Sequence, residues 1–503
     1  MASIYKNEED TKNMRTVRPH YYGDVNALVS SYLKGSQDKG LFLATDGMIG
    51  PGIVNTFVDG AIGAGLALEA APDRRFLKGI SENTINRNME IIEAHYDLIT
   101  STPELCDWSQ KMDFSEIMRI AVRGGLSTGD FLAGYKVRKV GDTYYPALQT
   151  IDGRNIRNPN FAEDTPQMIA GVELNNGVET AYNIATYKDS LLNEKFERVV
   201  RKKDGMLMYD LVRFGIVQPG QIRGRSILLP VFDRILDIKR YSAAELVKAI
   251  VQSSIPFFIT VAAQSQAPQN PDRSSVLKNI QDSQTTATGE VINDPIKIEA
   301  AYVNQLNAGE NIVFPESKAP VSQFWQFMEA QIKLIAMDIG IAPTVLLKAF
   351  RSNYSASQAE IQDAARGFDI LRQYIIRGCV QNYYNLHVEL LARQKIVNLP
   401  GFFEDPLIRR AWCTASWYGP AIMNIDPVKN ANASIALIQN GLSTRQKEAR
   451  KVGNDFEDNV VALQAEQKLI QKHGVKIGGP VVQEEEEEEE ETPTEEGEEN
   501  AQS

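Results

Sequence analysis

Cysteine and histidine are scarce in this sequence of 503 residues, which has three of the first and four of the second. The cysteines, Cys106, Cys379 and Cys413, are far apart and odd in number, which argues against a disulfide framework and favours a reducing compartment. No histidine has a second histidine or a cysteine close to it in the sequence that would complete a zinc site. We therefore expect no structural disulfide and no resident metal or cofactor.

Several catalytic motifs are also missing. The sequence has no Gly-Lys dipeptide, which excludes the phosphate-binding loop GxxxxGK[ST], and HExxH and paired CxxC motifs are absent. Carboxylates in turns leave one enzymatic alternative, a metal-dependent nuclease site built from Asp152, Glu163 and Asp164 or from Glu404 and Asp405. Solvated acidic residues are the more usual explanation of such turns. A structural role without catalytic residues is the leading interpretation.

Long apolar runs are lacking as well. The N-terminal stretch MASIYKNEEDTKNMR is charged and carries no secretory signal. The most apolar early stretch, residues 48–71, contains Asp59 and is rich in glycine. It is expected to form a helix, a glycine turn and a short strand rather than a membrane span.

The excess of negative charge lies entirely at the C-terminus. The formal net charge is −12, and 12 of the 65 acidic residues follow Gln483, including the unbroken glutamate run 484–491. The other 53 acidic residues balance 53 basic ones, so the rest of the chain is formally neutral. Because runs of like charge do not fold, residues 477–503 are expected to be a disordered tail that either solubilises the protein or contacts a partner.

The first half of the chain alternates helical and strand-like patterns and predicts an α+β fold. Residues 1–40 are polar and aromatic and are expected to be an arm, or short helices, that need a partner surface. Amphipathic helices are predicted at 83–100 and 114–125, the second ending on a glycine pair. Gly141-Asp142 indicates a hairpin between the first two of the predicted strands. These strands are 132–140, 143–151, 169–174, 179–187 and 207–212.

Two long helices flank a polar insertion. The first helix has Pro230 near its start, which is tolerated in an opening helical turn, and extends to residue 254. The second helix spans residues 320–338. Strands are predicted at 256–261 and within 290–313. We therefore expect a helical hairpin that carries a small β-rich head.

One amphipathic helix, 357–393, is longer than the others. Its length would be roughly 55 Å at about 1.5 Å per residue, with Gly378 as the expected bend. Short strands are predicted after it, over residues 392–417. Apolar residues recur at steps of three and four on one face of the helix. They are Ile361, Ala365, Phe368, Leu371, Ile375, Cys379, Tyr383, Leu386 and Leu390.

The loop before this helix, residues 347–357, carries Lys348, Arg351, Asn353 and Tyr354 among small residues. It presents positive charge and hydrogen-bond donors without enough apolar side chains to become buried. We expect this loop to line a hole.

The C-terminal region is predicted to be a small helical unit. A helix over 428–440 is expected to stop at Gly441. Ser443, with Gln446 three residues later, is the predicted N-cap of the next helix. The last helix is predicted at 454–472.

Several blocks of the sequence, taken in order, resemble the lambda-type portal proteins of tailed bacteriophages. The resemblance extends from about residue 47 to residue 458, and the order and spacing of the blocks carry it. The glutamate run of the tail matches none of them. The blocks are DGMIGPGIVNTFVDGAIGAGLALE, IDGRNIRNPN, IAGVELNNGVETAYNI, GQIRGRSILLPVFDRI, IGIAPTVLLKAFRSNYSASQAE, WYGPAIMNIDPVKNANAS and IQNGLSTRQKEARKVGNDFED.

The resemblance implies a portal fold, in which an α/β wing, a two-helix stem, a β-rich clip, a long kinked helix and a helical crown follow one another. Its parts would be an N-terminal arm (1–40), a wing (41–225 with 394–426), stem helices (226–254 and 320–339), a clip (255–319), a hinge and tunnel loop (340–357), the long helix (358–393), a crown (427–476) and the acidic tail (477–503).

The resemblance also implies a function. Portal proteins of this kind form a ring, usually of twelve subunits, at one capsid vertex, and double-stranded DNA passes through it during packaging and ejection. Implied partners are the terminase large subunit, the major capsid protein or scaffold, and a head–tail adaptor; no membrane is implied. The protein would be a virion component assembled in the host cytoplasm.

The same mapping assigns roles to particular residues. The tunnel loop would contact the DNA backbone through Lys348, Arg351, Asn353 and Tyr354. Glu329 and Asp338 are candidates for stem acids that face the channel. Two alternatives remain open at this point, the nuclease described above and another ring-forming head–tail adaptor, a class that is normally much shorter than this chain.

Overall fold

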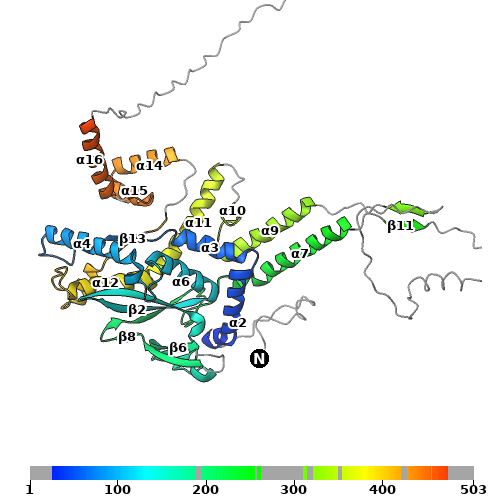
Figure 1. Cartoon of the computed structure of the whole chain (residues 1–503), viewed down its shortest axis with the longest axis horizontal. Coiled ribbons are helices and arrows are strands. Elements are labelled where there is room, and N and C mark those ends of the chain that lie inside the picture. Colours follow the sequence, from blue (N-terminus) through cyan, green and yellow to red (C-terminus); the bar gives the residue numbers. More distant parts are fainter. Residues whose placement is uncertain are drawn as a thin grey trace, which may run out of the picture. The chain divides into compact units, whose positions relative to one another are not determined.

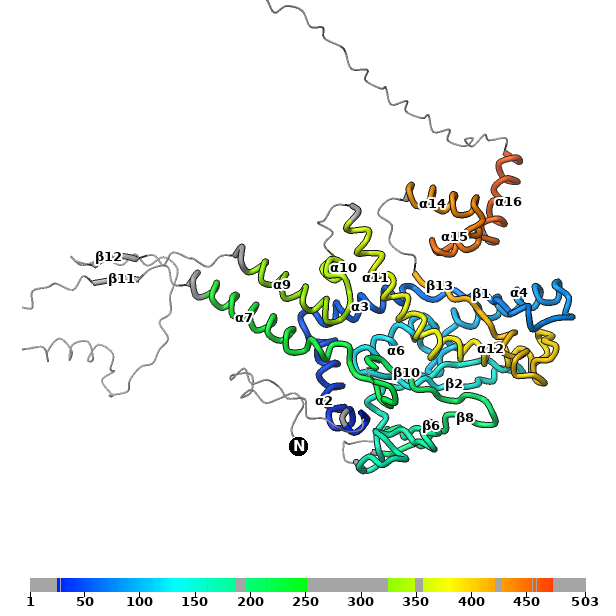
Figure 2. The backbone as a smooth tube through the Cα atoms, turned by 180° about the vertical axis from the view of Figure 1, so that it is seen from behind, coloured from blue at the N-terminus to red at the C-terminus, as the bar shows by residue number. Residues whose placement is uncertain are grey.

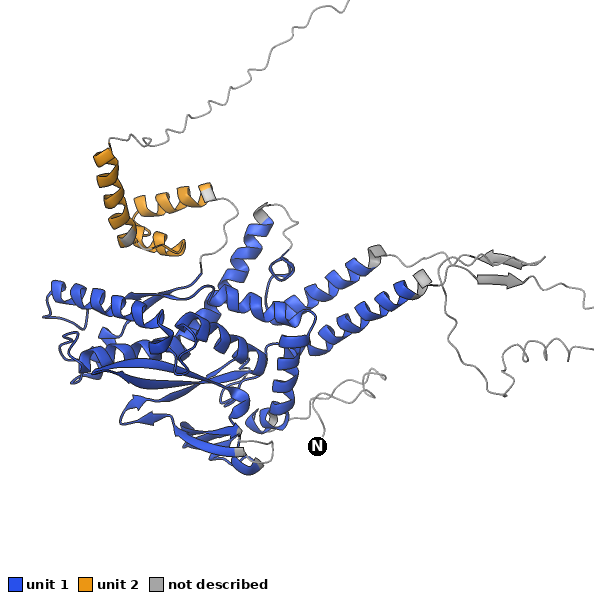
Figure 3. Ribbon diagram, viewed as in Figure 1, with its two compact units in different colours: residues 1–425 blue, residues 426–503 orange. Residues whose placement is uncertain are grey.

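The computed structural model describes residues 25–187, 194–216, 218–254, 258–261, 310–313, 321–348, 354–420, 427–454 and 456–473. The chain divides into two compact units, Met1–Ile425 and Asp426–Ser503, which Figure 3 colours separately. The first unit combines helices with several small sheets, and the described part of the second is helical. This mixed architecture agrees with the predicted α+β class.

Helix α2 (Val25–Asp46) has 22 residues and extends past residue 40, so residues 25–40 of the segment expected as an arm belong to one helix. It packs against α3 (Gly50–Ala61) and α6 (Phe114–Thr128). No single described helix is long and apolar enough to cross a bilayer; α2 and α3 together pass that test by length and composition, but they meet at 89°. The apolar residues Ile53 and Val54 of α3 are buried inside the protein.

Helices α4 (Glu82–Thr100) and α6 confirm two predicted helices, and each begins at a side-chain cap. At α6 the cap is a reciprocal pair between Asp113 and Glu116. The prediction that α6 ends on its glycine pair is wrong, because the helix continues to Gly129, whose φ is 107°. A Cβ on Gly125 would lie 2.3 Å from the Phe214 ring, so this glycine permits close packing rather than a helix end.

The central sheet has the order β10-β2-β3. Strands β2 (Asp130–Val140) and β3 (Thr143–Asp152) form the predicted hairpin, in which Val140 pairs with Thr143 and Gly141 has a φ of 60°. Strand β10 (Tyr209–Arg213) pairs with β2. Helix α6 packs on β2 and β3, as Figure 1 shows, and α5 (Pro103–Cys106) packs on β3.

A second sheet has the order β4-β5-β6-β7. A separate apolar cluster, which includes Leu132, Tyr182 and Leu211, packs between it and the central sheet. Strand β7 was not predicted. The strands are β4 (Met168–Ile169), β5 (Val172–Asn175), β6 (Val178–Tyr187) and β7 (Glu194–Val200), followed by the short pair β8 (Lys202–Lys203) and β9 (Met206–Leu207).

The predicted helical hairpin is present. A short helix, η3 (Leu229–Val231), leads into α7 (Phe232–Ser254), and α9 (Val321–Ile339) returns beside it, as both Figure 1 and Figure 2 show. In the sequence between these two helices, β11 (Phe258–Val261) and β12 (Glu310–Val313) form an antiparallel pair. The rest of the predicted head lies outside the described residues.

The predicted long helix is also present. It consists of α11 (Tyr354–Ile375), a π-helical segment η4 (Ile376–Val380) and α12 (Gln381–Arg393), without a break between them. The interruption therefore falls where Gly378 was expected to bend the helix. The apolar face of η4 and α12, with Cys379 and Tyr383, enters the main core of the first unit.

After the long helix the structure departs from the predicted short strands. Helix α13 (Pro406–Trp412) precedes the single strand β13 (Ala415–Tyr418), which pairs with β1 (Ala67–Ala70). In the second unit the helices are α14 (Pro427–Gln439), α15 (Arg445–Lys451) and α16 (Phe456–His473). The N-cap of α15 is Thr444, not Ser443, because the Thr444 hydroxyl accepts a hydrogen bond from the Lys447 N–H.

Candidate channel segment and its attachment

The hinge between α9 and the next helix is built on Gly340. Its φ of 73° allows the N–H of Ile341 to donate to the carbonyl of Ala336 (3.0 Å), which closes the end of α9. Ala342 then precedes α10 (Pro343–Leu347), a single short helix with proline in its first turn. Helix α10 contacts both α9 and α11.

Lys348 is the one predicted loop residue whose side chain the structure describes. It ends α10 in a left-handed conformation (φ 52°) and is exposed. Arg351 and Asn353 lie outside the described residues, and Tyr354 is the first residue of α11. The hydroxyl of Thr344, in α10, hydrogen-bonds to Glu360, in α11, so both ends of the loop are held together.

The long helix is fixed to α3 by side chains of α11. Arg372 donates to the carbonyls of Ala61 (2.9 Å) and Gly60 (3.0 Å), the last residues of α3. The rings of Phe57 and Phe368 meet edge to face at 5.9 Å. Beside these contacts lies a hollow of about 780 Å³, lined by α3, α10 and α11 and bordered by Lys348.

The two candidate stem acids already have basic neighbours. Glu329 forms an ion pair with Lys333 one turn along α9 (2.9 Å), and Asp338 faces Arg234 of α7 (3.6 Å). Both side chains remain partly exposed. Whether they face a channel stays a prediction, and Asp338 in addition links the two helices of the hairpin.

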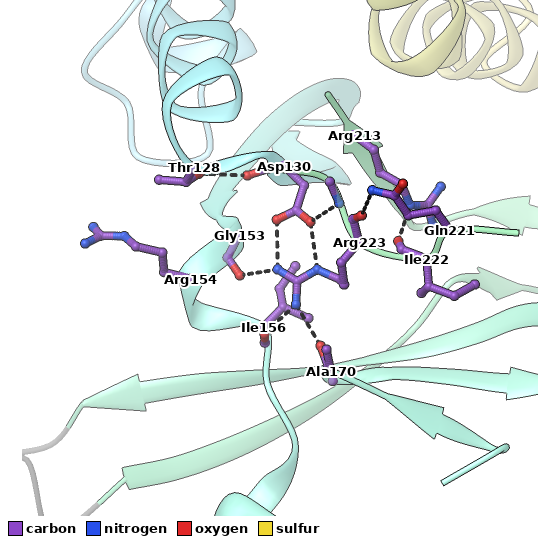
Figure 4. Close-up of polar contacts among 12 residues, drawn as sticks. Thr128, Asp130, Gly153, Arg154, Ile156, Ala170, Arg213, Gln221, Ile222 and Arg223 are labelled. Atoms are coloured by element: carbon purple, nitrogen blue, oxygen red, sulfur yellow. Dashed lines mark hydrogen bonds and ion pairs between the residues drawn. The ribbon is translucent and has the colours of Figure 1, made fainter. Parts of the chain in front are cut away.

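The segment that leads into the hairpin is attached to the body through a buried arginine, Arg223, which precedes α7 by nine residues. In addition, Ile235 and Ile238 of α7 lie in the main apolar core. The Nε of Arg223 and one Nη2 hydrogen donate to the carboxylate of Asp130 in β2 (2.7 and 2.8 Å). The remaining three hydrogens donate to the carbonyls of Gly153 (2.7 Å), Ile156 (2.8 Å) and Ala170 (2.7 Å). All five guanidinium N–H groups are therefore satisfied, as Figure 4 shows.

The Asp130 carboxylate is equally occupied. Besides Arg223 it accepts the backbone N–H of Gly224 (3.0 Å). A Cβ on Gly153, the first residue of η1 (Gly153–Asn155), would lie 1.9 Å from the carboxylate, so no side chain fits there. The Asp130–Arg223 cluster thus joins four segments that are distant in the sequence.

Comparison with known proteins assigns the family. The family described as phage portal protein, lambda family, matches residues 11–372. This chain belongs to the lambda family of phage portal proteins. Portal protein B of Escherichia phage lambda is 22% identical over 417 residues, covering 80% of this chain and 77% of its own. The portal protein of Escherichia phage N15 is 22% identical over 448 residues, covering 86% and 83%.

Solved structures give a weaker likeness. A chain from the neck of a native GTA particle, computed with C12 symmetry, has a TM-score of 0.39 at 12% identity, covering 87% of this portal protein and 95% of that chain. A chain from the neck of an empty GTA particle has a TM-score of 0.42, also at 12% identity and with the same coverage. The family assignment does not depend on these two matches.

In this portal protein three of the five carboxylates considered for a nuclease have other partners. Asp152 pairs with Arg154 (2.9 Å), and Asp405 caps α13 by accepting the N–H of Leu407 (2.7 Å). Asp164 accepts from the Ala170 N–H (2.8 Å). Among the residues that the structure describes, no group of three or more His, Cys, Asp or Glu could hold a metal ion.

The Asp130–Arg223 cluster was not predicted, although three of the sequence blocks that resemble portal proteins meet in it. IDGRNIRNPN supplies two of the acceptor carbonyls, IAGVELNNGVETAYNI supplies the third, and GQIRGRSILLPVFDRI supplies Arg223. The sequence contained one sign of this cluster, which was the combination of glycine and arginine in turns to which no other function was assigned.

Proposed function

We propose that this portal protein assembles into a closed ring, usually of twelve copies, around a channel through which double-stranded DNA is packaged and ejected. The ring would occupy one vertex of the capsid and remain in the virion. Membership of residues 11–372 in a portal family is the observation that carries this proposal. The chain would act without a catalytic site of its own.

The helical hairpin supports a role as the stem. Several large apolar side chains are exposed on it, among them Leu246 of α7 (63% exposed) and Trp325 and Met337 of α9 (68% and 72%). An isolated hairpin would leave these side chains in water, whereas neighbouring copies in a ring would cover them. We therefore assign α7 and α9 to the contacts between adjacent subunits.

The segment 347–357 is proposed as the tunnel loop. One lysine and one arginine per subunit become rings of positive charge, and Lys348 is exposed at the end of α10. Each phosphate that is neutralised adds to affinity and to salt dependence, so a few such contacts permit sliding where a strongly basic wall would hold the DNA still. Outside the tail, the chain is formally neutral, with 53 basic and 53 acidic residues.

The remaining parts follow the mapping of the family onto this sequence. Residues 41–225 with 394–426 would form the wing, 255–319 the clip and 427–476 the crown. The clip would dock the terminase large subunit during packaging and a head–tail adaptor afterwards, and the wing would contact the major capsid protein or scaffold. In the first unit, the pairing of β1 with β13 brings the two proposed wing segments together.

Negative-stain electron microscopy of the purified full-length chain tests the proposed ring. We expect rings of about twelve subunits with a central hole, and a sedimentation coefficient to match. Monomers that never form rings, with divalent-metal-dependent cleavage of DNA, would overturn the proposal in favour of the nuclease.

A further inference from the structure

Helix α15 of the second unit is strongly basic. It has four basic residues among seven, Arg445, Lys447, Arg450 and Lys451, against the single acid Glu448. The carboxylate of Glu448 is turned inward, where it accepts from Ser434 (2.8 Å), Ser443 (2.5 Å) and Lys451 (2.6 Å). It neutralises Lys451 but not the rest of the helix.

Two of these basic side chains have no such partner. Arg445 and Lys447 are exposed, and neither is paired with a carboxylate among the described residues. Burial of apolar side chains does not explain this helix either, since its seven residues include one alanine and no larger apolar side chain. The helix therefore offers a positive surface suited to a polyanion.

The chain itself contains a polyanion, whose charge is opposite to that of α15. Residues 484–491 are eight consecutive glutamates, and ten residues separate them from the end of α16 at position 473. Ten extended residues reach about 35 Å. Helix α16, with 18 residues, is about 27 Å long and packs against α15. The connection is therefore long enough for the glutamates to return along α16 to α15.

We propose that the glutamate run 484–491 docks on the basic side chains of α15 in the same copy, and thereby covers a surface that would otherwise bind DNA phosphate. A tethered segment of this length has a local concentration in the millimolar range, so DNA must compete with it. The tail would thus keep the second unit from holding DNA.

Zero-length coupling of carboxylates to lysines tests the contact directly. The full chain is treated with a carbodiimide after equal amounts of copies labelled with nitrogen-14 and nitrogen-15 have been mixed before assembly, so that any ring contains both labels. We expect coupling of residues 484–491 to Lys447 within copies of the same isotope, well above coupling to the exposed Lys202 and Lys203 of β8. Equal coupling to all three lysines, or a mixed-isotope share of the products close to the one half that random pairing of copies gives, would overturn the proposal.

A binding cycle with a 30-base-pair DNA duplex of arbitrary sequence tests the competition. Replacing all eight glutamates by glutamine should tighten binding about ten-fold at low salt. In a chain that also carries Arg445→Gln and Lys447→Gln, the gain should fall below about two-fold, while the control Lys202→Gln with Lys203→Gln should keep it. A gain in DNA affinity of the same size in all three backgrounds indicates general repulsion and contradicts docking. The absence of any gain in affinity also contradicts docking.

Discussion

Arg223 is 1% exposed and Asp130 is inaccessible, so the energetics of this pair follow the rules for buried charges. A buried ion pair is tolerated only where hydrogen bonds satisfy the remaining donors and acceptors. Here the planar guanidinium matches one carboxylate and three carbonyls at once. A lysine has three donors on a single atom and lacks this geometry.

Removing one partner of this pair should be costly. We expect Asp130→Asn to lower the free energy of unfolding by about 3–5 kcal/mol, because it leaves the Arg223 charge buried and uncompensated. The matched control is Arg154→Gln, which breaks the partly exposed pair with Asp152 and should cost about 0–1 kcal/mol. Urea denaturation followed by tryptophan fluorescence measures both, and equal costs for the two variants would contradict the argument.

His387 makes stability depend on pH. This residue of α12 is buried, and its Nε2 lies 3.3 Å from the carbonyl of Ile92 in α4. Burial lowers its pKa from 6.5 to about 4. The folded state therefore holds the neutral ring, whereas the unfolded state binds a proton below pH 6.5. The contribution of His387 to the free energy of unfolding is complete above pH 6.5 and is lost as pH falls toward 4.

This loss should amount to roughly 3 kcal/mol for the wild-type chain. His387→Gln removes the titrating group and should flatten the dependence between pH 6.5 and pH 4, even if the variant is less stable at pH 7. Urea midpoints at several pH values for both proteins measure this. A variant that loses stability as steeply as the wild type would assign the acid sensitivity to other groups.

At the scale of elements, two glycines illustrate different uses of the same residue. Gly340 ends α9 with a positive φ, whereas Gly378 lies within η4, where a Cβ would meet Val212 at an ordinary contact distance of 3.5 Å. The π-helical segment has its own compensation, since the carbonyl of Gly378 accepts from the hydroxyl of Tyr135 (3.4 Å) and the side-chain amide of Asn382 (3.2 Å). A methyl side chain therefore fits at position 378 without a clash.

Alanine at these two positions should act in opposite directions. We expect Gly340→Ala to destabilise by about 1–2 kcal/mol because of the left-handed conformation. Gly378→Ala should stabilise by about 0.5–1 kcal/mol, because alanine loses less conformational freedom in a helix. Thermal unfolding of the two variants under identical conditions compares them, and destabilisation by Gly378→Ala would show that η4 requires the glycine.

The exposed apolar residues of the hairpin lead to a prediction about assembly. Trp325→Gln with Met337→Gln should reduce ring formation at least ten-fold, since the loss of two buried side chains at each interface is repeated around the ring. The control is Leu98→Gln on α4, which is 70% exposed and lies outside the hairpin. Analytical ultracentrifugation measures assembly, and circular dichroism checks that the subunits remain folded. Normal rings from the double variant would contradict the proposed stem contact.

Elements with strong periodicity were predictable, and those defined by distant partners were not. Helices α7, α9 and α11 to α12 follow from apolar spacing, and the β2–β3 hairpin follows from Gly141-Asp142. Strand β7 was missed because its sequence, EKFERVV, alternates charged and apolar residues only weakly, and its pairing with β6 establishes it. Helix α13 was missed because it has only seven residues, begun by the Asp405 cap.

The candidate site shows the same division. Lys348 could be identified from its place in a short basic loop, and the structure describes it at the end of α10. Arg223 could not, because nothing local to it reveals that its partners are Asp130 and three carbonyls from two other segments. A charged residue in a glycine-rich turn is usually solvated, and only the fold shows that this one is buried.

At the scale of the whole molecule, the distribution of charge leads to a prediction for the tunnel loop. Lys348→Ala with Arg351→Ala should leave rings intact but change the efficiency of DNA packaging, with the effect strongest at low salt. The control is Lys202→Ala with Lys203→Ala on β8, which removes the same charge elsewhere. Packaging in an extract at several salt concentrations measures this, and normal packaging by the loop variant throughout would contradict the assignment.

The Asp130–Arg223 cluster also has a mechanical consequence. Force applied along α7 enters the body through the segment that contains Arg223, and the five hydrogen bonds of this side chain point to acceptors on different strands and turns. Such bonds must break together under shear rather than one after another as in an unzipping hairpin. Tension on α7 would therefore be shared between the strand that carries Asp130, the segments that supply the three carbonyls, and the apolar core in which Ile235 and Ile238 of α7 are buried.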